Sequence, residues 1–446
     1  MSETSVYCHR CWIDEKLQPA TVHIRDGKIT SIEFGYKNDV NPDDGQILMP
    51  GVIDAHVHIN EPGRTDWEGF ETATAAAVAG GITTLVDMPL NSSPVTTSVE
   101  NLEIKIASTV GKLRANVGFY GGVVPGNTAE LKGLADMGVL GFKCFLVHSG
   151  IDEFPNVTRQ DLEEAMPVIA STSRPLLVHC ELDDHKAWSD LAGHPGKYHE
   201  WVKSRPGLWE VSAVSMMAEL SARHSCPIHI VHVSESSVLN IIADARNAGL
   251  PLTAETCPHY LLFCEEDIPD SNTLYKCAPP IRNRANNRQL AEALKVGLLD
   301  MVASDHSPAP PGIKEIPSGN LLRAWGGIAG LQFLLPASWT ALKQIMGLET
   351  YIPLVTEKPA AMLGLDDRKG YIRTGYDADL VLWKPEEKFA VRQNDILHRH
   401  KASPYEGLEL YGKTKSVMVN GIKVFGTGSE ESPAGKIILG HKKRYN

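Results

Sequence analysis

The chain has 446 residues, of which 43% are hydrophobic and 22% are charged, and its formal net charge is −11 at pH 7. This composition is typical of a globular protein with a large core, and the acidic balance argues against nucleic acid or an anionic membrane as the main partner. The N-terminal stretch MSETSVYCHRCWIDEK lacks the basic and apolar regions of a secretory signal, and the most apolar long stretch is broken by a glycine pair and Asp87, so we expect a cytoplasmic location and no membrane span.

The first predicted elements are alternating strands over residues 20–35, joined at Asp26-Gly27, a dipeptide typical of hairpin turns. Cys8 and Cys11 precede them in a C-x-x-C motif. No second pair follows at zinc-ribbon spacing, so a zinc site is not expected there. The eight cysteines of the chain are scattered, which fits reduced thiols.

The middle of the chain, residues 51–364, alternates short apolar runs with amphipathic helical patterns. The runs are apolar on both faces, as a parallel sheet wrapped by helices requires. Eight such strands close a barrel, so we predict an α/β barrel here. The expected strands span residues 51–58, 82–88, 115–123, 139–146, 175–182, 227–234, 251–258 and 300–306.

The C-terminal part returns to alternating strands. One is expected near residue 380, and a hairpin is expected over 416–428 with Asn420-Gly421 at its turn. Because this pattern matches that of the N-terminal part, we predict that residues 1–50 and 365–446 form one small β domain, completed from both sides of the barrel.

Polar side chains stand at the ends of the expected barrel strands, where the chemistry of such barrels is found. His56 and His58 are two residues apart, so on a strand both point to the same face. Singly, each of these residues has an ordinary explanation, such as a hydrogen-bonded core histidine or a helix cap. Together, four imidazoles and a carboxylate at neighbouring strand ends predict a site for two divalent metal ions. The five residues are His56, His58, His179, His232 and Asp305.

Lys143 lies at the centre of the apolar run VLGFKCFLV. A buried ammonium group is costly, and its charge would add to the repulsion between two metal ions. Our hypothesis is that the amine carries a carbon dioxide-derived carboxylate, a carbamate that bridges both metals. Two alternatives stay open: an ammonium paired with a carboxylate inside the barrel, or a side chain on the outer face that reaches solvent.

Four stretches, PGVIDAHVHINEPG, GFKCFL, ETCPHYL and ASDHSP, resemble motifs of the cyclic amidohydrolases of the amidohydrolase superfamily. The resemblance extends over nearly the whole chain. It implies a distorted (β/α)8 TIM barrel with a small β-sandwich built from both termini, and a homotetramer. It also implies two metal ions, most often zinc, with manganese and cobalt as alternatives. His56, His58 and Asp305 would hold one ion, His179 and His232 would hold the other, and carboxylated Lys143 would bridge them.

Two positions separate this chain from branches of that family. Asn60 stands where dihydroorotases have an arginine that binds the substrate carboxylate, and an amide cannot replace a bidentate guanidinium. His148 stands where dihydropyrimidinases have a tyrosine that supports the oxyanion. The remaining stretches, residues 58–94 and 324–332, are similar to those of the allantoinases.

The resemblance therefore implies hydrolysis of the hydantoin ring of allantoin to allantoate, with Asp305 and Lys143 as catalytic residues. The alternative is a hydantoinase or dihydropyrimidinase activity, and dihydroorotase activity is less expected. Non-enzymatic relatives typically lose metal ligands, and none is lost here. For Arg64 an ion pair that fixes its loop is an equal alternative to substrate binding. The candidate substrate contacts are Asn60, Arg64, Asn91, Ser92, Cys277, Ala278 and Ser304.

Overall fold

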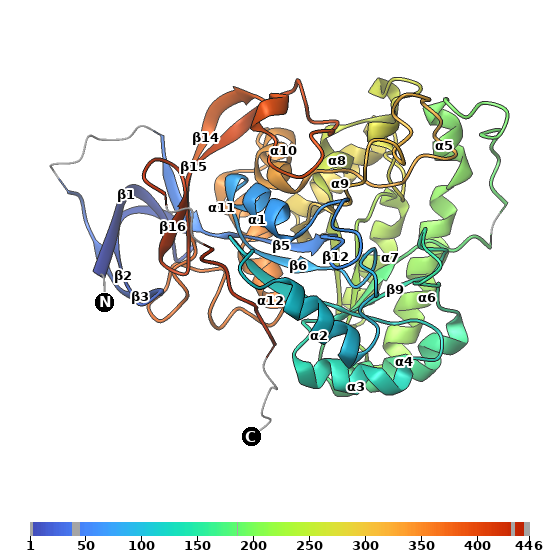
Figure 1. Ribbon diagram of the computed structural model, residues 1–446, viewed down its shortest axis with the longest axis horizontal. Coiled ribbons are helices and arrows are strands. Elements are labelled where there is room, and N and C mark those ends of the chain that lie inside the picture. The colour runs from blue at the N-terminus through green and yellow to red at the C-terminus, as the bar shows by residue number, and fades with distance from the viewer. Residues whose placement is uncertain (1–2, 38–44, 185, 430–432, 441–446) are drawn as a thin grey trace.

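A computed structural model describes residues 3–37, 45–184, 186–429 and 433–440. Its centre is a barrel of parallel strands (Figure 1). Strands β7 and β8 lie on either side of Tyr120 and fill one position, so the barrel has eight positions, and it closes where Val57 pairs in parallel with His306. The strands are β5 (Val52–Val57), β6 (Ile82–Asp87), β7 (Asn116–Phe119), β8 (Gly121–Gly122), β9 (Phe142–Phe145), β10 (Leu176–His179), β11 (Ile228–Ile230), β12 (Leu252–Thr256) and β13 (Met301–Val302).

Helices follow the barrel strands and cover the outside of the barrel, as the α2, α3, α4 and α6 ribbons of Figure 1 illustrate. Within the described ranges no helix is both long and apolar enough to cross a membrane. The α-helices are α1 (Phe70–Ala79), α2 (Val99–Ser108), α3 (Thr128–Met137), α4 (Arg159–Ser171), α5 (Tyr198–Ser204), α6 (Gly207–His224), α7 (Leu239–Asn247), α8 (Pro258–Leu262), α9 (Arg284–Lys295), α10 (Leu334–Leu342), α11 (Leu348–Val355) and α12 (Glu357–Met362). The short 3-10 helices are η1 (Ser236–Val238), η2 (Glu265–Asp267), η3 (Thr273–Tyr275), η4 (Leu331–Phe333) and η5 (Gln393–Asp395).

Helix α4 shows how the sequence defines these helices. Thr158 is its N-cap, and the Thr158 and Asp161 side chains cap each other's backbone N–H groups in a capping box. The buried residues recur at helical spacing, so one face of α4 packs on the barrel. They are Leu162, Ala165, Met166 and Ile169.

The two ends of the chain share one seven-stranded sheet, seen beside the barrel in Figure 1 with β1–β3 in blue and β14–β16 in orange-red. Both predicted hairpin turns are present, and the φ angles of Asp26, Gly27, Asn420 and Gly421 are all positive, as the favoured two-residue turn requires. The fold class inferred from the sequence is thus confirmed. The strands are β1 (Glu3–Ile13), β2 (Lys16–Arg25), β3 (Lys28–Phe34), β4 (Ile47–Pro50), β14 (Leu380–Ala390), β15 (Glu409–Val419) and β16 (Ile422–Phe425).

Candidate metal centre

Five of the six residues predicted as metal ligands lie at or just after the carboxyl ends of barrel strands, and the sixth, Lys143, lies within β9. The four imidazoles form a contiguous row, with ring centres 5.6 Å apart for His58 and His56, 5.4 Å for His56 and His232, and 4.6 Å for His232 and His179. The row brings together side chains from β5, β10 and the segment after β11. The spacing of these rings is compatible with shared metal ions. That the four histidines are metal ligands stays a prediction.

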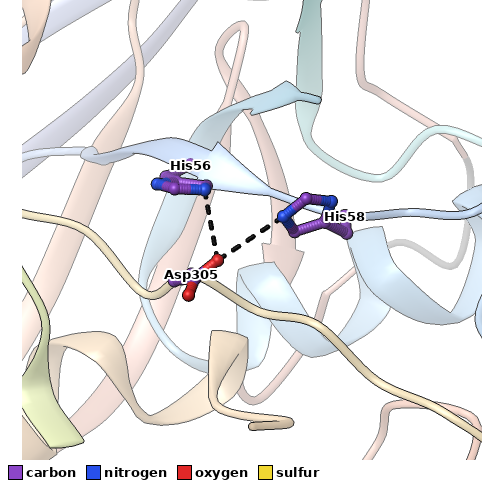
Figure 2. Close-up of side chains that lie close together, drawn as sticks. All are labelled: His56, His58 and Asp305. Atoms are coloured by element: carbon purple, nitrogen blue, oxygen red, sulfur yellow. Dashed lines mark ion pairs between the residues drawn. The ribbon is translucent and has the colours of Figure 1, made fainter. Parts of the chain in front are cut away.

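His56, His58 and Asp305 form the tightest group (Figure 2). The Asp305 Oδ1 atom lies 3.1 Å from His56 Nε2 and 3.5 Å from His58 Nε2, and one potential ligand atom from each residue lies within 4.8 Å of the others. Burial alone would raise the pKa of Asp305, but the surrounding imidazoles hold it well below its usual value. Asp305 is therefore a carboxylate, and the three donors suit a divalent cation.

The buried histidines offer lone pairs rather than charge. Burial lowers the pKa of His58 to about 4, and it also lowers the pKa values of His179 and His232. Neutral imidazole is the form that binds metal ions. The Nδ1 atom of His232 is buried and has no hydrogen-bond partner among the described residues, so it is free to accept a ligand bond.

Lys143 in β9 is completely buried, which confirms that it lies inside the protein. Its Nζ atom lies 4.6 Å from the centre of the Phe145 ring, and Phe145 in turn stacks on His179 with 4.6 Å between ring centres. Nζ has no hydrogen-bond partner in the part of the chain that the structure describes, and burial lowers the pKa of Lys143 to about 8. An amine without an acceptor beside neutral imidazoles and one carboxylate fits a site that receives cations and a bridging anion.

Glu255 in β12 fixes the orientation of His56. Its Oε1 atom accepts a hydrogen bond of 2.6 Å from His56 Nδ1, and its Oε2 atom lies 3.1 Å from His229 Nε2. Burial would raise the pKa of Glu255, but these histidines hold it at about 2, so Glu255 is ionised. The proton of His56 is thereby kept on Nδ1, and Nε2 presents its lone pair toward Asp305.

Glu181 fixes the orientation of His179 in the same way. Its Oε2 atom accepts a 2.7 Å hydrogen bond from His179 Nε2, which leaves Nδ1 of that ring as the lone-pair atom. Arg205 donates to both oxygens of Glu181, and together with His179 it holds the pKa of that carboxylate at about 2 in spite of burial. Each half of the predicted binuclear site thus has one histidine oriented by a buried carboxylate.

Four residues at the site adopt a left-handed backbone conformation that residues other than glycine rarely take. The φ angles are +68° at Asn60, +67° at Asn91, +40° at His232 and +46° at Asp305. Left-handed backbone at such residues costs free energy and persists only where surrounding contacts enforce it. Four such residues at one place indicate that the fold tolerates a loss of stability in order to direct these side chains into the site.

A cavity of about 570 Å³ opens over this group. Of the candidate substrate contacts, Arg64, Asn91 and Ala278 line it. Arg64 makes a 2.7 Å ion pair with Glu153, which is the alternative that the sequence left open. The side-chain amide of Asn91 lies 3.4 Å from His58 Nδ1, so Asn91 also supports a predicted ligand.

The other candidate substrate contacts lie behind this lining. Asn60 donates to the carbonyl of Pro308, and its Oδ1 atom, like the Ser92 hydroxyl, has no partner among the described residues. Ser304 donates its Oγ to the His56 carbonyl at 3.5 Å, and the carbonyl of Cys277 accepts from Trp201. Substrate binding by these residues stays a prediction.

His148 also lines the cavity, and its side chain is more than half exposed, with its ring 3.4 Å from Asp152.

The two carboxylates that orient the histidines, Glu181 and Glu255, were not predicted from the sequence. Glu181 had a signal, because it stands two residues after His179 and shares its face of the strand. Glu255 stands in the quoted ETCPHYL motif, but nothing in the sequence pairs it with His56.

Comparisons with known proteins match most of this chain. The profile described as the amidohydrolase family covers residues 47–424. An allantoinase of Arabidopsis thaliana is 44% identical over 87% of this chain and 79% of its own, and an allantoinase of Streptomyces avermitilis is 41% identical over 95% of this chain and 96% of its own. The solved structure of an L-hydantoinase (dihydropyrimidinase) from Arthrobacter aurescens superimposes with a TM-score of 0.90, at 29% identity, over 96% of this chain and 98% of that one.

Proposed function

The chain belongs to the amidohydrolase family, and from this premise we propose that it hydrolyses the hydantoin ring amide of allantoin to give allantoate. The reaction class rests on one observation, the assembly of four histidines, a carboxylate and a buried lysine at one end of the barrel. The substrate rests on the relatives named allantoinase, which match the chain at 41–44% identity.

We further propose that the site holds two divalent ions. His56, His58 and Asp305 would hold one, His179 and His232 would hold the other, and a carboxylated Lys143 would bridge them. Imidazole and carboxylate ligands suit zinc best, with manganese or cobalt as alternatives. When bound, such ions polarise a carbonyl group and lower the pKa of a coordinated water to about 7.

The residues of the chain supply the remaining chemistry. Asp305 lines the cavity as a carboxylate, so it can accept the proton of the attacking water and donate it to the ring nitrogen as the C–N bond breaks. Glu255 and Glu181 keep His56 and His179 in one tautomer throughout, so no proton is lost to the ligands. The products of this step are a carboxylate and a free ureido nitrogen, which are the groups of allantoate.

The finer expectations come from the composition of the sequence and from its resemblance to the cyclic amidohydrolases. We propose a cytoplasmic homotetramer whose partner is a small-molecule substrate and not nucleic acid, in line with the net charge of −11. Asn60 in place of an arginine argues against dihydroorotate. The alternative, a hydantoinase, is favoured by the superposition on L-hydantoinase, whereas the retention of every predicted ligand argues against a non-enzymatic relative.

The test is a comparison of kcat/KM for allantoin, hydantoin, dihydrouracil and dihydroorotate with the purified, metal-loaded protein. We expect allantoin to be the best substrate and dihydroorotate to be inert. A higher kcat/KM for hydantoin or dihydrouracil than for allantoin would replace the proposal with the hydantoinase alternative. Metal analysis of the same sample should find about two ions per chain, and a metal-free protein without activity would favour a non-enzymatic role.

A further inference from the structure

The lysine and arginine side chains that line the cavity differ in how their charges are compensated. Three of the four form ion pairs with carboxylates, and these pairs are Arg64 with Glu153 at 2.7 Å, Arg205 with Glu181 at 2.5 Å and Arg323 with Glu315 at 3.0 Å. The fourth, Lys276, has no carboxylate partner among the described residues. Its positive charge therefore faces the cavity without a counter-charge from any residue that the structure describes.

The ammonium group of Lys276 is held in a fixed place. The residue is only 5% exposed, its Nζ atom donates a 2.5 Å hydrogen bond to the carbonyl of Ala324, and it lies 4.5 Å from the centre of the Trp201 ring. An ammonium has three N–H donors, so two remain for a ligand. A cation in this position is ordered before any ligand arrives, which lowers the entropy cost of binding.

A second buried lysine nearby shows what a purely structural lysine looks like in this fold. Lys314 donates to three backbone carbonyls, those of Lys276, Trp325 and Gly327, which uses all of its N–H groups. Lys314 is also not part of the cavity lining, whereas Lys276 is. The difference between the two indicates that the spare donors of Lys276 serve the cavity and not the loop.

Lys276 lies on the wall of the cavity. Its partners are Trp201 and Ala324, and none of its described contacts reaches His56, His58 or Asp305. With the ring carbonyl at the imidazole and carboxylate group, we place the substituent of the ring toward Lys276 on the wall of the same cavity. For allantoin that substituent is a ureido group, whose carbonyl oxygen is a strong acceptor.

We propose that Lys276 binds the carbonyl oxygen of the ureido tail and thereby selects ureido-substituted hydantoins over unsubstituted ones. This inference rests on the proposed function. The ureido oxygen accepts one or both of the free N–H groups of Lys276, while the bond to Ala324 keeps the ammonium in place. A charge-assisted hydrogen bond in a buried site contributes more than one between neutral groups, which suits a specificity contact.

The experiment measures kcat/KM for allantoin, and the inhibition constant of hydantoin against allantoin, in the wild type and two variants. In Lys276→Gln the amide can still donate to Ala324, and Lys276→Met tests the same loss without any donor. We expect each variant to lower kcat/KM for allantoin by about 10- to 100-fold, because a hydrogen bond to a charged group is lost. The inhibition constant of hydantoin, which lacks the tail, should change by less than about threefold.

Arg323→Met is the matched control, since it removes an exposed cation of the same cavity whose charge is already paired with Glu315. It should change both constants by less than about threefold. Equal weakening of allantoin and hydantoin in the Lys276 variants, or no weakening of either, would overturn the inference and leave Lys276 as a support for Ala324. A wild type that turns over hydantoin but not allantoin would instead overturn the proposed function, and this inference with it.

Discussion

The His56 side chain is constrained at both of its ring nitrogens. Glu255 holds Nδ1 at 2.6 Å, and Nε2 faces Asp305 at 3.1 Å. Because Glu255 is fully buried and ionised, the tautomer of His56 does not depend on solvent. A metal ligand oriented in this way loses less freedom on binding.

Replacing Glu255 with glutamine should weaken metal binding. The amide can hydrogen-bond to His56 but cannot hold its proton on Nδ1 as a carboxylate does, so we expect metal affinity to fall about 10- to 100-fold. Competition with a chromogenic chelator measures this directly in the purified protein. Glu265→Gln, a change at a carboxylate that pairs with the exposed His199, is the control and should leave the affinity unchanged. Unaltered metal affinity in Glu255→Gln would contradict the orienting role.

The placement of individual side chains could be predicted wherever a local sequence pattern determined it. The two-residue spacing of His56 and His58 placed both on one face, and the apolar run around Lys143 placed it in the interior. Glu255 lies 199 positions from His56, and only the barrel register brings them together, so no local pattern reveals the pair. The spare donors of Lys276 depend on side-chain packing and were equally hidden.

Among the secondary-structure elements, helix α2 is tied to strand β6 by a completely buried ion pair. Lys105 donates to Asp87 Oδ2 at 2.6 Å and to the carbonyl of Met88 at 3.0 Å, and the other Asp87 oxygen accepts from the backbone of Ile59. Ile59 follows His58 directly. The pair therefore connects a surface helix to the loop that carries a predicted ligand.

Lys105→Met should destabilise the protein by about 3–5 kcal/mol, because it leaves the Asp87 carboxylate buried and unpaired. Urea unfolding measures the loss, with Lys132→Met on the exposed side of α3 as the control. The double variant Lys105→Met/Asp87→Asn should recover part of the stability, since the neutral amide no longer needs a counter-charge. If Lys105→Met is as stable as the control, the ion pair does not fix α2.

The elements themselves were largely predictable. All eight expected strands are present, because runs that are apolar on both faces and separated by helical patterns are typical of a parallel barrel. The break between β7 and β8 was not foreseen. Tyr120 lies where the strand changes its pairing partner, from β6 before the break to β9 after it. The Tyr120 hydroxyl donates a hydrogen bond to the carbonyl of Ala55. Such a break depends on neighbouring strands, not on local sequence.

In the whole molecule, the terminal sheet and the barrel are joined through Asp379. Its Oδ2 atom accepts from Asn116 in β7 at 3.0 Å and from Lys369 at 2.5 Å, and its Oδ1 atom accepts from the backbone of Asn420 at 2.7 Å. One hydrophobic cluster also contains Trp12 and Trp383 from the terminal sheet together with barrel residues. The two parts therefore share a core, and we expect them to unfold together.

Asp379→Ala should lower the free energy of unfolding by about 3 kcal/mol, because Lys369 and two further donors lose a buried acceptor. Tryptophan fluorescence and far-UV circular dichroism should report one coincident transition in both wild type and variant. Asp366→Ala, at an exposed carboxylate, is the control. Two separate transitions would show that the terminal sheet and the barrel fold independently, against this account.

The matching strand patterns of the two chain ends predicted that they join into one sheet. The contacts that hold this sheet beside the barrel could not be predicted from the sequence. Asn116, Asp379 and Asn420 are polar residues at ordinary turn and strand-end positions, and their network exists only in the folded chain. The predicted domain limits at residues 50 and 365 remain to be tested, for instance by limited proteolysis.

We propose that a Lys143 carboxylated by carbon dioxide would bridge two metal ions, one held by His56, His58 and Asp305 and the other by His179 and His232. The most direct measurement is a high-resolution crystal structure of the metal-loaded protein grown in the presence of bicarbonate. We predict planar density extending from Lys143 Nζ, with each of its two terminal oxygens in contact with one metal ion. A bare amine at Lys143 beside fully occupied metal sites would contradict the account.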